Sequence, residues 1–167
     1  MRPRSRATSL AATLGLAACA GLGGVRPYYG PVPGSVSLEF PAPPDAVTRA
    51  AAEEVQHAGL ELQWMSAAEG YVETQWFNVT TRASALSPDA RDLDHSVKLR
   101  FFADPTAGKT RLAAEVVTTY AMDPSRPPRE MERMAPEGHP GREVLTQILD
   151  RLKSRFPSPT DTTRTPR

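Results

Sequence analysis

Residues 35–60 read SVSLEFPAPPDAVTRAAAEEVQHAGL, and within this stretch the spacing of the apolar residues changes. Every second residue of 36–40 is apolar, which predicts a β-strand with one buried face. Pro44 and Asp45 then favour a helix start, because proline fixes φ for the first turn and aspartate complements the helix dipole. The following residues repeat at helical spacing up to Gly59, a natural stop. The expected apolar face of this helix comprises Val47, Ala50, Ala51, Val55 and Ala58.

Four further strands are expected after this helix. Alternating apolar residues predict two of them, over residues 60–64 and 95–102, and the strands over 71–77 and 110–120 return after turns. Turn-forming residues lie at 68–70 and 104–108, and a longer polar loop covers 79–94. Because hairpin-length connections join neighbouring strands, these strands are expected to be antiparallel.

The last predicted element is a helix with a clear apolar stripe. The stripe comprises Leu145, Ile148, Leu149, Leu152 and Phe156. Arg151, Lys153 and Arg155 crowd its C-terminal end, where cations interact favourably with the helix dipole. Two amphipathic helices bury their stripes best on one face of an antiparallel sheet. The sequence therefore predicts an α+β fold, with the element order β-α-β-β-β-β-α and both helices on one face of the sheet.

The first 19 residues have the composition of a bacterial export signal. Three arginines lie within the first six residues, and a short apolar run then leads to Leu16-Ala17-Ala18-Cys19. The run is too short to cross a bilayer, which takes roughly 20 apolar residues. This ending, with the only cysteine of the chain, resembles the lipobox of bacterial lipoproteins.

The lipobox resemblance implies cleavage between Ala18 and Cys19 and a diacylglycerol on the Cys19 thiol, with a further acyl chain on the new amino terminus. Two or more chains anchor a protein stably, since each buried CH₂ contributes about 0.8 kcal/mol. Ala20 stands where some Gram-negative lipoproteins carry an aspartate that retains them at the inner membrane. By that resemblance the protein is expected at the outer membrane, facing the periplasm.

Proline and glycine mark the expected domain boundaries. Residues 1–18 are the expected signal peptide, and residues 19–34 are expected to form a Pro/Gly-rich tether that begins with the lipidated cysteine. The apolar patterns fall within residues 35–156, which are expected to fold as one monomeric domain. Residues 157–167 are polar and lack periodicity, which predicts a disordered tail.

The charge of the chain argues against some classes of partner. Removing the leader lowers the 20 basic residues to 17, against 19 acidic ones, so the mature chain carries about −2. Neither a nucleic-acid footprint nor a polybasic membrane patch is expected from this balance. The membrane contact is expected to come from the lipid on Cys19 alone. With that thiol modified, no disulfide is expected.

Candidate catalytic and metal-binding residues are few. The three histidines are His57, His95 and His139, and none has a second ligand at metal-binding spacing. Asp92, Asp94 and His95 would have to meet in a cleft to support an enzyme, which is the less favoured interpretation. We therefore expect no catalytic residues, no metal and no cofactor.

The segment over residues 121–140 is long for a connection, and such loops are often functional. Residues 127–130 favour a single helical turn within it. Met131, Arg133 and Met134 are the candidate partner-binding residues, because methionines on a loop suit adaptable contacts. The alternative is that the same side chains cover the sheet edge or the core.

A second resemblance rests on motifs inside the predicted domain. Residues 44–47 open the first helix as PDAV, Gly59-Leu60 closes it, and residues 70–74 read GYVET in the hairpin. Together with the lipobox and tether, this order is similar to the helix-grip domains of the BamC lipoproteins of the outer-membrane barrel assembly machine. The resemblance implies an accessory, non-enzymatic envelope lipoprotein that binds another envelope protein. An alternative is that a helix clasped by the sheet encloses a pocket for a lipid or another apolar small molecule.

Overall fold

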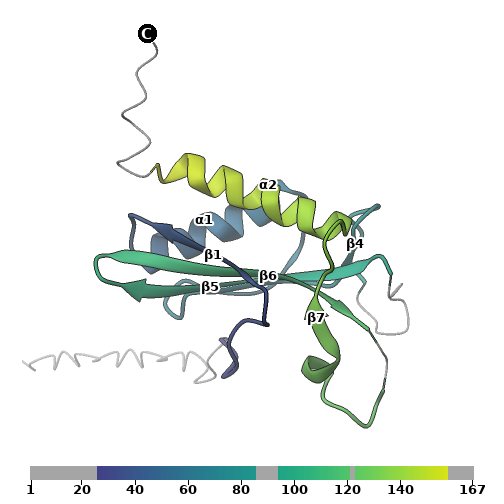
Figure 1. Cartoon of the computed structure of the whole chain (residues 1–167). Coiled ribbons are helices and arrows are strands. Elements are labelled where there is room, and N and C mark those ends of the chain that lie inside the picture. Colours follow the sequence, from purple (N-terminus) through teal and green to yellow (C-terminus); the bar gives the residue numbers. More distant parts are fainter. Residues whose placement is uncertain (1–25, 86–93, 121–122, 158–167) are drawn as a thin grey trace, which may run out of the picture.

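The computed structural model describes residues 26–85, 94–120 and 123–157, which form one antiparallel sheet with both α-helices on one face (Figure 1). The main strand order is β1-β6-β5-β3-β2, with β4 paired to β5 and β7 to β6. The strands are β1 (Val36–Phe40), β2 (Leu62–Ser66), β3 (Tyr71–Thr74), β4 (Phe77–Asn78), β5 (Ser96–Thr106), β6 (Lys109–Thr119) and β7 (Glu132–Met134). The helices are α1 (Pro44–His57), the 3₁₀ helix η2 (Pro128–Met131) and α2 (Pro140–Arg155). The predicted α+β class is confirmed.

Both α-helices begin at a proline, as the fixed φ of proline favours. The α1 face that packs on the sheet is buried at Val47, Ala50, Ala51 and Val55, as predicted. Gly59 then takes a φ of +75°, a conformation that glycine adopts without steric cost. The side chain of His139 caps α2 by accepting a hydrogen bond from the Gly141 N–H at 3.0 Å.

The core between the helices and the sheet is apolar. Alternate residues of β5 and β6 face the helices, and the apolar stripe of α2 packs onto them. The largest of these buried side chains are Phe40, Phe77, Phe101, Leu99, Leu112, Leu145, Ile148 and Leu152. This face of the sheet is here called the helix face.

Several strands differ from the sequence-based expectation. β2 lies two residues later than the expected 60–64. β5 continues past residue 102 to Thr106 and β6 begins one residue early at Lys109, so the turn between them shrinks to Ala107 and Gly108. The predicted strand over 71–77 divides into β3 and β4, which pair with different parts of β5. The loop over 121–140 contributes β7, which pairs with the end of β6. Very short strands such as β4 and β7 have no room to show a period in the sequence.

Gly70 shows why the β2–β3 hairpin can sit beside β5. Its φ is +67°, and an added Cβ would lie 2.1 Å from the Ala103 carbonyl oxygen. The Gly70 carbonyl in turn accepts a hydrogen bond from the Ala103 N–H at 2.7 Å. Only glycine permits both this backbone angle and this close approach.

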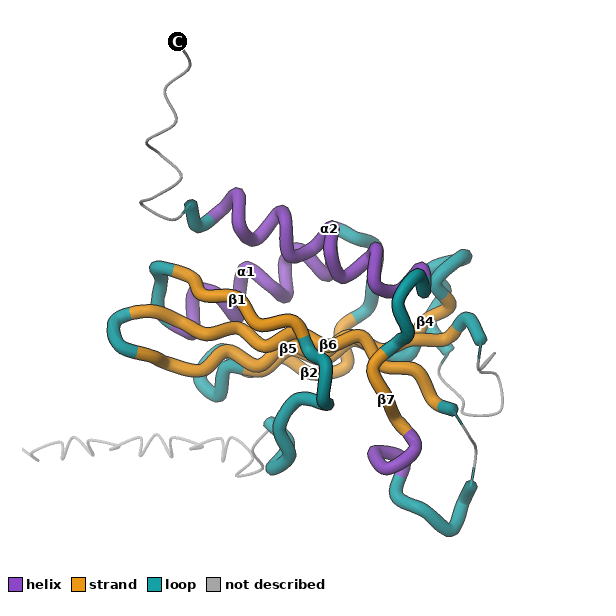
Figure 2. The backbone as a smooth tube through the Cα atoms, viewed as in Figure 1, coloured by secondary structure: helices purple, strands orange, loops and turns teal. Residues whose placement is uncertain are grey.

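Residues 26–34, here called the strap, fall in the segment expected to be a tether. The structure places them on the side of the sheet away from the helices, where η2 also lies (Figures 1 and 2). The backbone N–H of Arg26 donates to Glu69 at 2.8 Å, and its guanidinium pairs with Asp104 at 2.8 Å. The face that the strap covers is here called the strap face.

Candidate functional site

Charged side chains meet on the strap face, where most sheets would place either solvent-facing or apolar residues. Arg100 of β5 lies directly opposite Glu73 of β3 on one side and Glu115 of β6 on the other. Its side chain is only 3% exposed and that of Glu115 is 0% exposed. Lys98 lies two residues before Arg100 on β5, Arg129 belongs to η2 and Glu132 to β7. These residues together form what we call the charge cluster. Its members are Glu73, Lys98, Arg100, Glu115, Arg129 and Glu132.

Arg100 is the centre of the charge cluster. Its Nη1 and Nη2 donate to the two carboxylate oxygens of Glu132 at 2.7 and 2.9 Å, a bidentate pair. Nη1 also donates to Glu115 at 2.9 Å, and Nε donates to Glu73 at 3.2 Å. One guanidinium therefore joins three buried carboxylates from three strands.

Two further cations complete the charge cluster. Arg129 donates from Nη1 to Glu115 at 2.9 Å and to Glu132 at 3.1 Å. Lys98 donates to Glu73 and, at 2.9 Å, to the side-chain oxygen of Gln63. The three cations thus balance the three carboxylates, which is the condition for burying them at all.

The strap completes the burial of these charges. The backbone N–H of Val32 donates to the Glu115 carboxylate at 2.6 Å, and the Gly30 carbonyl accepts from Arg129 at 2.9 Å. The Tyr29 ring lies 4.3 Å from the Arg129 guanidinium carbon and 5.7 Å from that of Arg100. The strap is therefore held by the same groups that it covers.

Burial and ion pairing act against each other on the titratable groups. Burial alone would raise the pKa of Glu73, but Arg100 and then Lys98 outweigh it and hold that pKa below its usual value. Burial likewise opposes ionisation of Glu132, and hydrogen bonds from Arg100 lower its pKa overall. Burial lowers the pKa of Lys98 in spite of its pairing with Glu73. Burial and the hydrogen bond to Glu73 raise the pKa of Tyr71, which stays a neutral donor.

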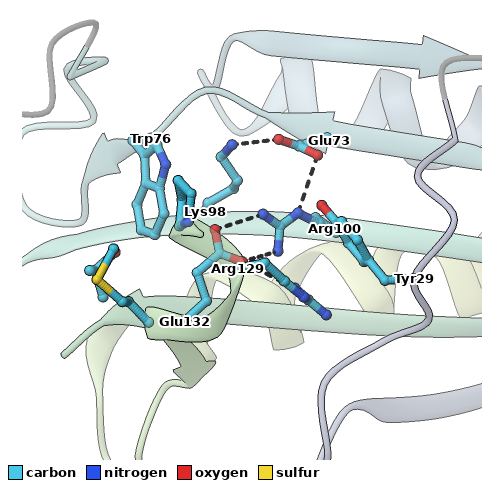
Figure 3. Close-up of a pocket in the computed structure, with 10 residues that line it drawn as sticks. Tyr29, Glu73, Trp76, Lys98, Arg100, Arg129 and Glu132 are labelled. Atoms are coloured by element: carbon cyan, nitrogen blue, oxygen red, sulfur yellow. Dashed lines mark hydrogen bonds and ion pairs between the residues drawn. The ribbon is translucent and has the colours of Figure 1, made fainter. Parts of the chain in front are cut away.

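A pocket of about 410 Å³ opens beside the charge cluster (Figure 3). Glu73, Lys98 and Arg100 line it from the sheet, and Tyr29 of the strap bounds it on one side. Trp76 stands at the opposite side in Figure 3, with the Lys98 ammonium 5.5 Å from its ring centre. The remaining lining residues are Thr119, Pro128, Arg129, Met131 and Glu132.

The carboxylates that line the pocket are hydrogen-bond acceptors. Guanidinium groups hold Glu73 and Glu132 ionised, so these carboxylates accept hydrogen bonds and do not give up protons near neutral pH. Within the described residues, no group of three or more His, Cys, Asp or Glu side chains could hold a metal ion. What the arrangement offers a ligand is a polar floor between aromatic and apolar walls.

The predicted partner-loop residues divide between interior and surface. Met131 is 6% exposed and lines the pocket, and its sulfur accepts from the Asp123 N–H at 3.2 Å. Met134 is half-buried and packs against the core. Arg133 is exposed, with its guanidinium carbon 5.6 Å from the Tyr120 ring centre. Ala18 and Cys19 lie outside the described residues.

The structure brings only some of the other candidate residues together. The His139 ring contacts the Asp94 carbonyl oxygen at 3.2 Å, and both residues line a second pocket of about 210 Å³. His95 is exposed at the start of β5, and His57 is exposed near the end of α1. Asp92 lies outside the described residues.

Sequence reasoning missed the charge cluster and the pocket. The available signal was the opposite charge of neighbours on adjacent strands, with Glu73, Arg100 and Glu115 on the face of the sheet opposite the core residues Val72, Leu99 and Val116. Comparison with known proteins finds no matching family model and no similar curated protein. In the described part of the chain, no helix has the length and apolar character of a membrane span.

Proposed function

We propose that this protein is a lipid-anchored envelope lipoprotein whose domain acts by binding a partner and not by catalysis. The observation that carries the proposal is the Leu16-Ala17-Ala18-Cys19 lipobox, with its basic start and short apolar run. The strand, helix and hairpin order of the domain supports the resemblance to the BamC lipoproteins and the accessory role that it implies. The mutual ion pairing of the charge cluster supports binding over acid–base chemistry.

The anchoring is tested with Cys19→Ser and labelled palmitate in the native cell. We expect the parent to incorporate label and run as a cleaved protein, and the variant to accumulate as unlabelled precursor. Label retained by Cys19→Ser would disprove the lipoprotein assignment.

The outer-membrane, periplasm-facing location is a separate part of the proposal. Ala20→Asp should move the protein to the inner-membrane fraction of a density gradient, while Ala20→Ser should leave it in the outer-membrane fraction. The same distribution for both variants would remove the basis for placing the protein at the outer membrane.

The partner surface is proposed to lie on the segment over residues 121–140, around Arg133. The exposed Arg133 offers a charged contact, whereas Met131 and Met134 contribute to packing. Replacing Arg133 by Ala should therefore reduce capture of the partner from solubilised membranes without lowering the melting temperature. Met131→Ala should instead lower the melting temperature, because the Met131 side chain is buried. Arg126→Ala, at an exposed position of the same segment, is the matched control.

A small-molecule binding role is the second candidate, and the pocket of about 410 Å³ favours it. This pocket lies on the strap face and is lined by charged groups, so it differs from the apolar pocket between helix and sheet that the sequence suggested. An enzyme stays the least supported class.

A further inference from the structure

The pocket beneath the strap offers more hydrogen-bond donors than the charge cluster uses. An ammonium has three N–H groups, and that of Lys98 donates two hydrogen bonds, to Glu73 and Gln63. A guanidinium has five, and Arg129 spends three on Glu115, Glu132 and the Gly30 carbonyl. Its Nε–H and one Nη2–H have no partner among the described residues.

The acceptors of the same site are largely used. Each of Glu73, Glu115 and Glu132 accepts three hydrogen bonds within the described part of the chain. A carboxylate offers about four lone-pair sites, so little capacity is left. The group that complements this pocket therefore brings acceptors, not donors.

Charge decides which acceptor fits. The pocket lining carries three cations, Lys98, Arg100 and Arg129, against the two carboxylates of Glu73 and Glu132. The third carboxylate, Glu115, lies fully buried and does not line the pocket. Glu115 pairs with Arg100 and Arg129 from beneath the lining, so the charge cluster as a whole is balanced and a singly charged acceptor is the most that it supports. A phosphate dianion would place a second charge against Glu132 and Glu115.

The walls of the pocket suit a carbon body. Trp76 and Met131 are each 6% exposed, and the Tyr29 and Pro128 side chains complete an apolar surround. A volume of about 410 Å³ falls within the range of roughly 300–1,000 Å³ typical of small-ligand sites. Thr119 adds a hydroxyl that has no hydrogen-bond partner in the described residues.

We propose that this pocket binds an organic carboxylate, whose oxygens accept from Arg129, Lys98 and Thr119 and whose carbon body lies between Trp76 and Met131. A planar guanidinium edge matches the two oxygens of a carboxylate, which favours this anion over a spherical one. The proposal rests on the binding role proposed above and names the chemistry of its ligand. A free small acid and the C-terminus of a peptide both supply that chemistry.

The test is calorimetric titration of the detergent-solubilised full chain at 0.15 M salt. The probes are phenylacetate, 4-phenylbutyrate and the tripeptide Gly-Gly-Phe, each paired with its neutral amide. We expect at least one acid to bind tenfold or more tightly than its amide. A peptide preference would identify a C-terminus as the source, and a preference for the small acids would identify a metabolite. Equal affinity of acid and amide, or no saturable binding of any acid, would overturn the proposal.

Variants locate the binding in this pocket. Thr119→Val removes one donor without disturbing the charge cluster, and it should weaken the binding of the best acid about three- to tenfold. Thr118→Val is the matched control, because Thr118 is the neighbouring residue of β6 and does not line this pocket. Arg129→Lys keeps the charge but loses the planar fork, and it should weaken acid binding tenfold or more and reduce the preference for acid over amide. Equal effects of Thr118→Val and Thr119→Val would place the binding elsewhere.

The failure of this proposal differs from failure of the lipoprotein assignment. Cys19→Ser should abolish acylation and leave the affinity for the acid unchanged. A protein that is acylated but shows no acid preference would keep its anchor and lose only the ligand proposed here.

Discussion

The two faces of β5 line two different buried regions, the apolar core beneath the helices and the charge cluster beneath the strap. Val97, Leu99 and Phe101 point toward the helices and pack among apolar side chains, whereas Lys98 and Arg100 point toward the strap and are held by carboxylates. Both sets are buried, but burial stabilises the first directly and is unfavourable for the second unless each charge has its partner. The helix face should therefore respond to changes of volume, and the strap face to changes of pairing.

The largest effect is expected from breaking the charge cluster at its centre. Arg100→Met removes the one cation that joins Glu73, Glu115 and Glu132, and it leaves buried carboxylates short of partners. We expect a loss of about 3–5 kcal/mol in the free energy of unfolding, measured by urea denaturation. Arg133→Met, on the exposed side of β7, is the control and should cost under about 0.5 kcal/mol. A small change in the free energy of unfolding of Arg100→Met would mean that water hydrates the carboxylates in place of the guanidinium.

The matching change on the helix face is Leu149→Ala. Leu149 is 4% exposed on α2 and belongs to the apolar core, so its truncation leaves a cavity. We expect a loss of about 2–5 kcal/mol in the same measurement. Leu149→Met, which conserves volume, should cost less than about 1.5 kcal/mol. If both substitutions cost the same, packing is not what holds α2 to the sheet.

The stability contributed by the two faces of the sheet should also differ in its dependence on pH. Because the folded-state pKa values of Glu73 and Glu132 are lowered, their contribution to stability is present above the unfolded value of about 4.3. It is lost as the pH falls through the lowered folded-state values. The urea midpoint should thus drop between pH 7 and pH 3, and Glu73→Gln should make that drop smaller. Leu149→Ala should shift the midpoint at both pH values without changing the size of the drop.

These contrasts also explain what the sequence could and could not predict. The apolar periods predicted α1, α2 and the helix face, because a helix or strand with one buried face repeats its apolar residues along the chain. The same periods assigned no role to Lys98 and Arg100. A period-two pattern shows only that the other face of a strand is polar, and it does not show whether that face is buried. Their burial depends on contacts from Tyr29, Arg129 and Glu132, which come from segments remote in sequence.

The strap is the clearest example of this limit. Its composition of glycine and proline predicts an extended segment. The local sequence does not determine whether such a segment stays in solvent or packs on a surface. What decides is a partner outside the segment, in this case the Glu115 carboxylate that accepts from the Val32 N–H. No local pattern within residues 26–34 encodes that acceptor.

The smallest expected effect tests whether the strap is held by the charges it covers. Tyr28 and Tyr29 are neighbours in the strap, but Tyr28 is fully exposed whereas Tyr29 stacks on Arg129. Cation–π contacts contribute about 0.5–2 kcal/mol, so Tyr29→Ala should lower the free energy of unfolding by that amount and Tyr28→Ala by less than about 0.5 kcal/mol. Hydrogen exchange gives the local readout: the Val32 amide should exchange faster in Tyr29→Ala, because the strap opens more often, while amides of β5 keep their protection. Unchanged exchange at Val32 would mean that the hydrogen bond to Glu115 holds the strap without help from the ring, and the strap face would then depend on its ion pairs alone.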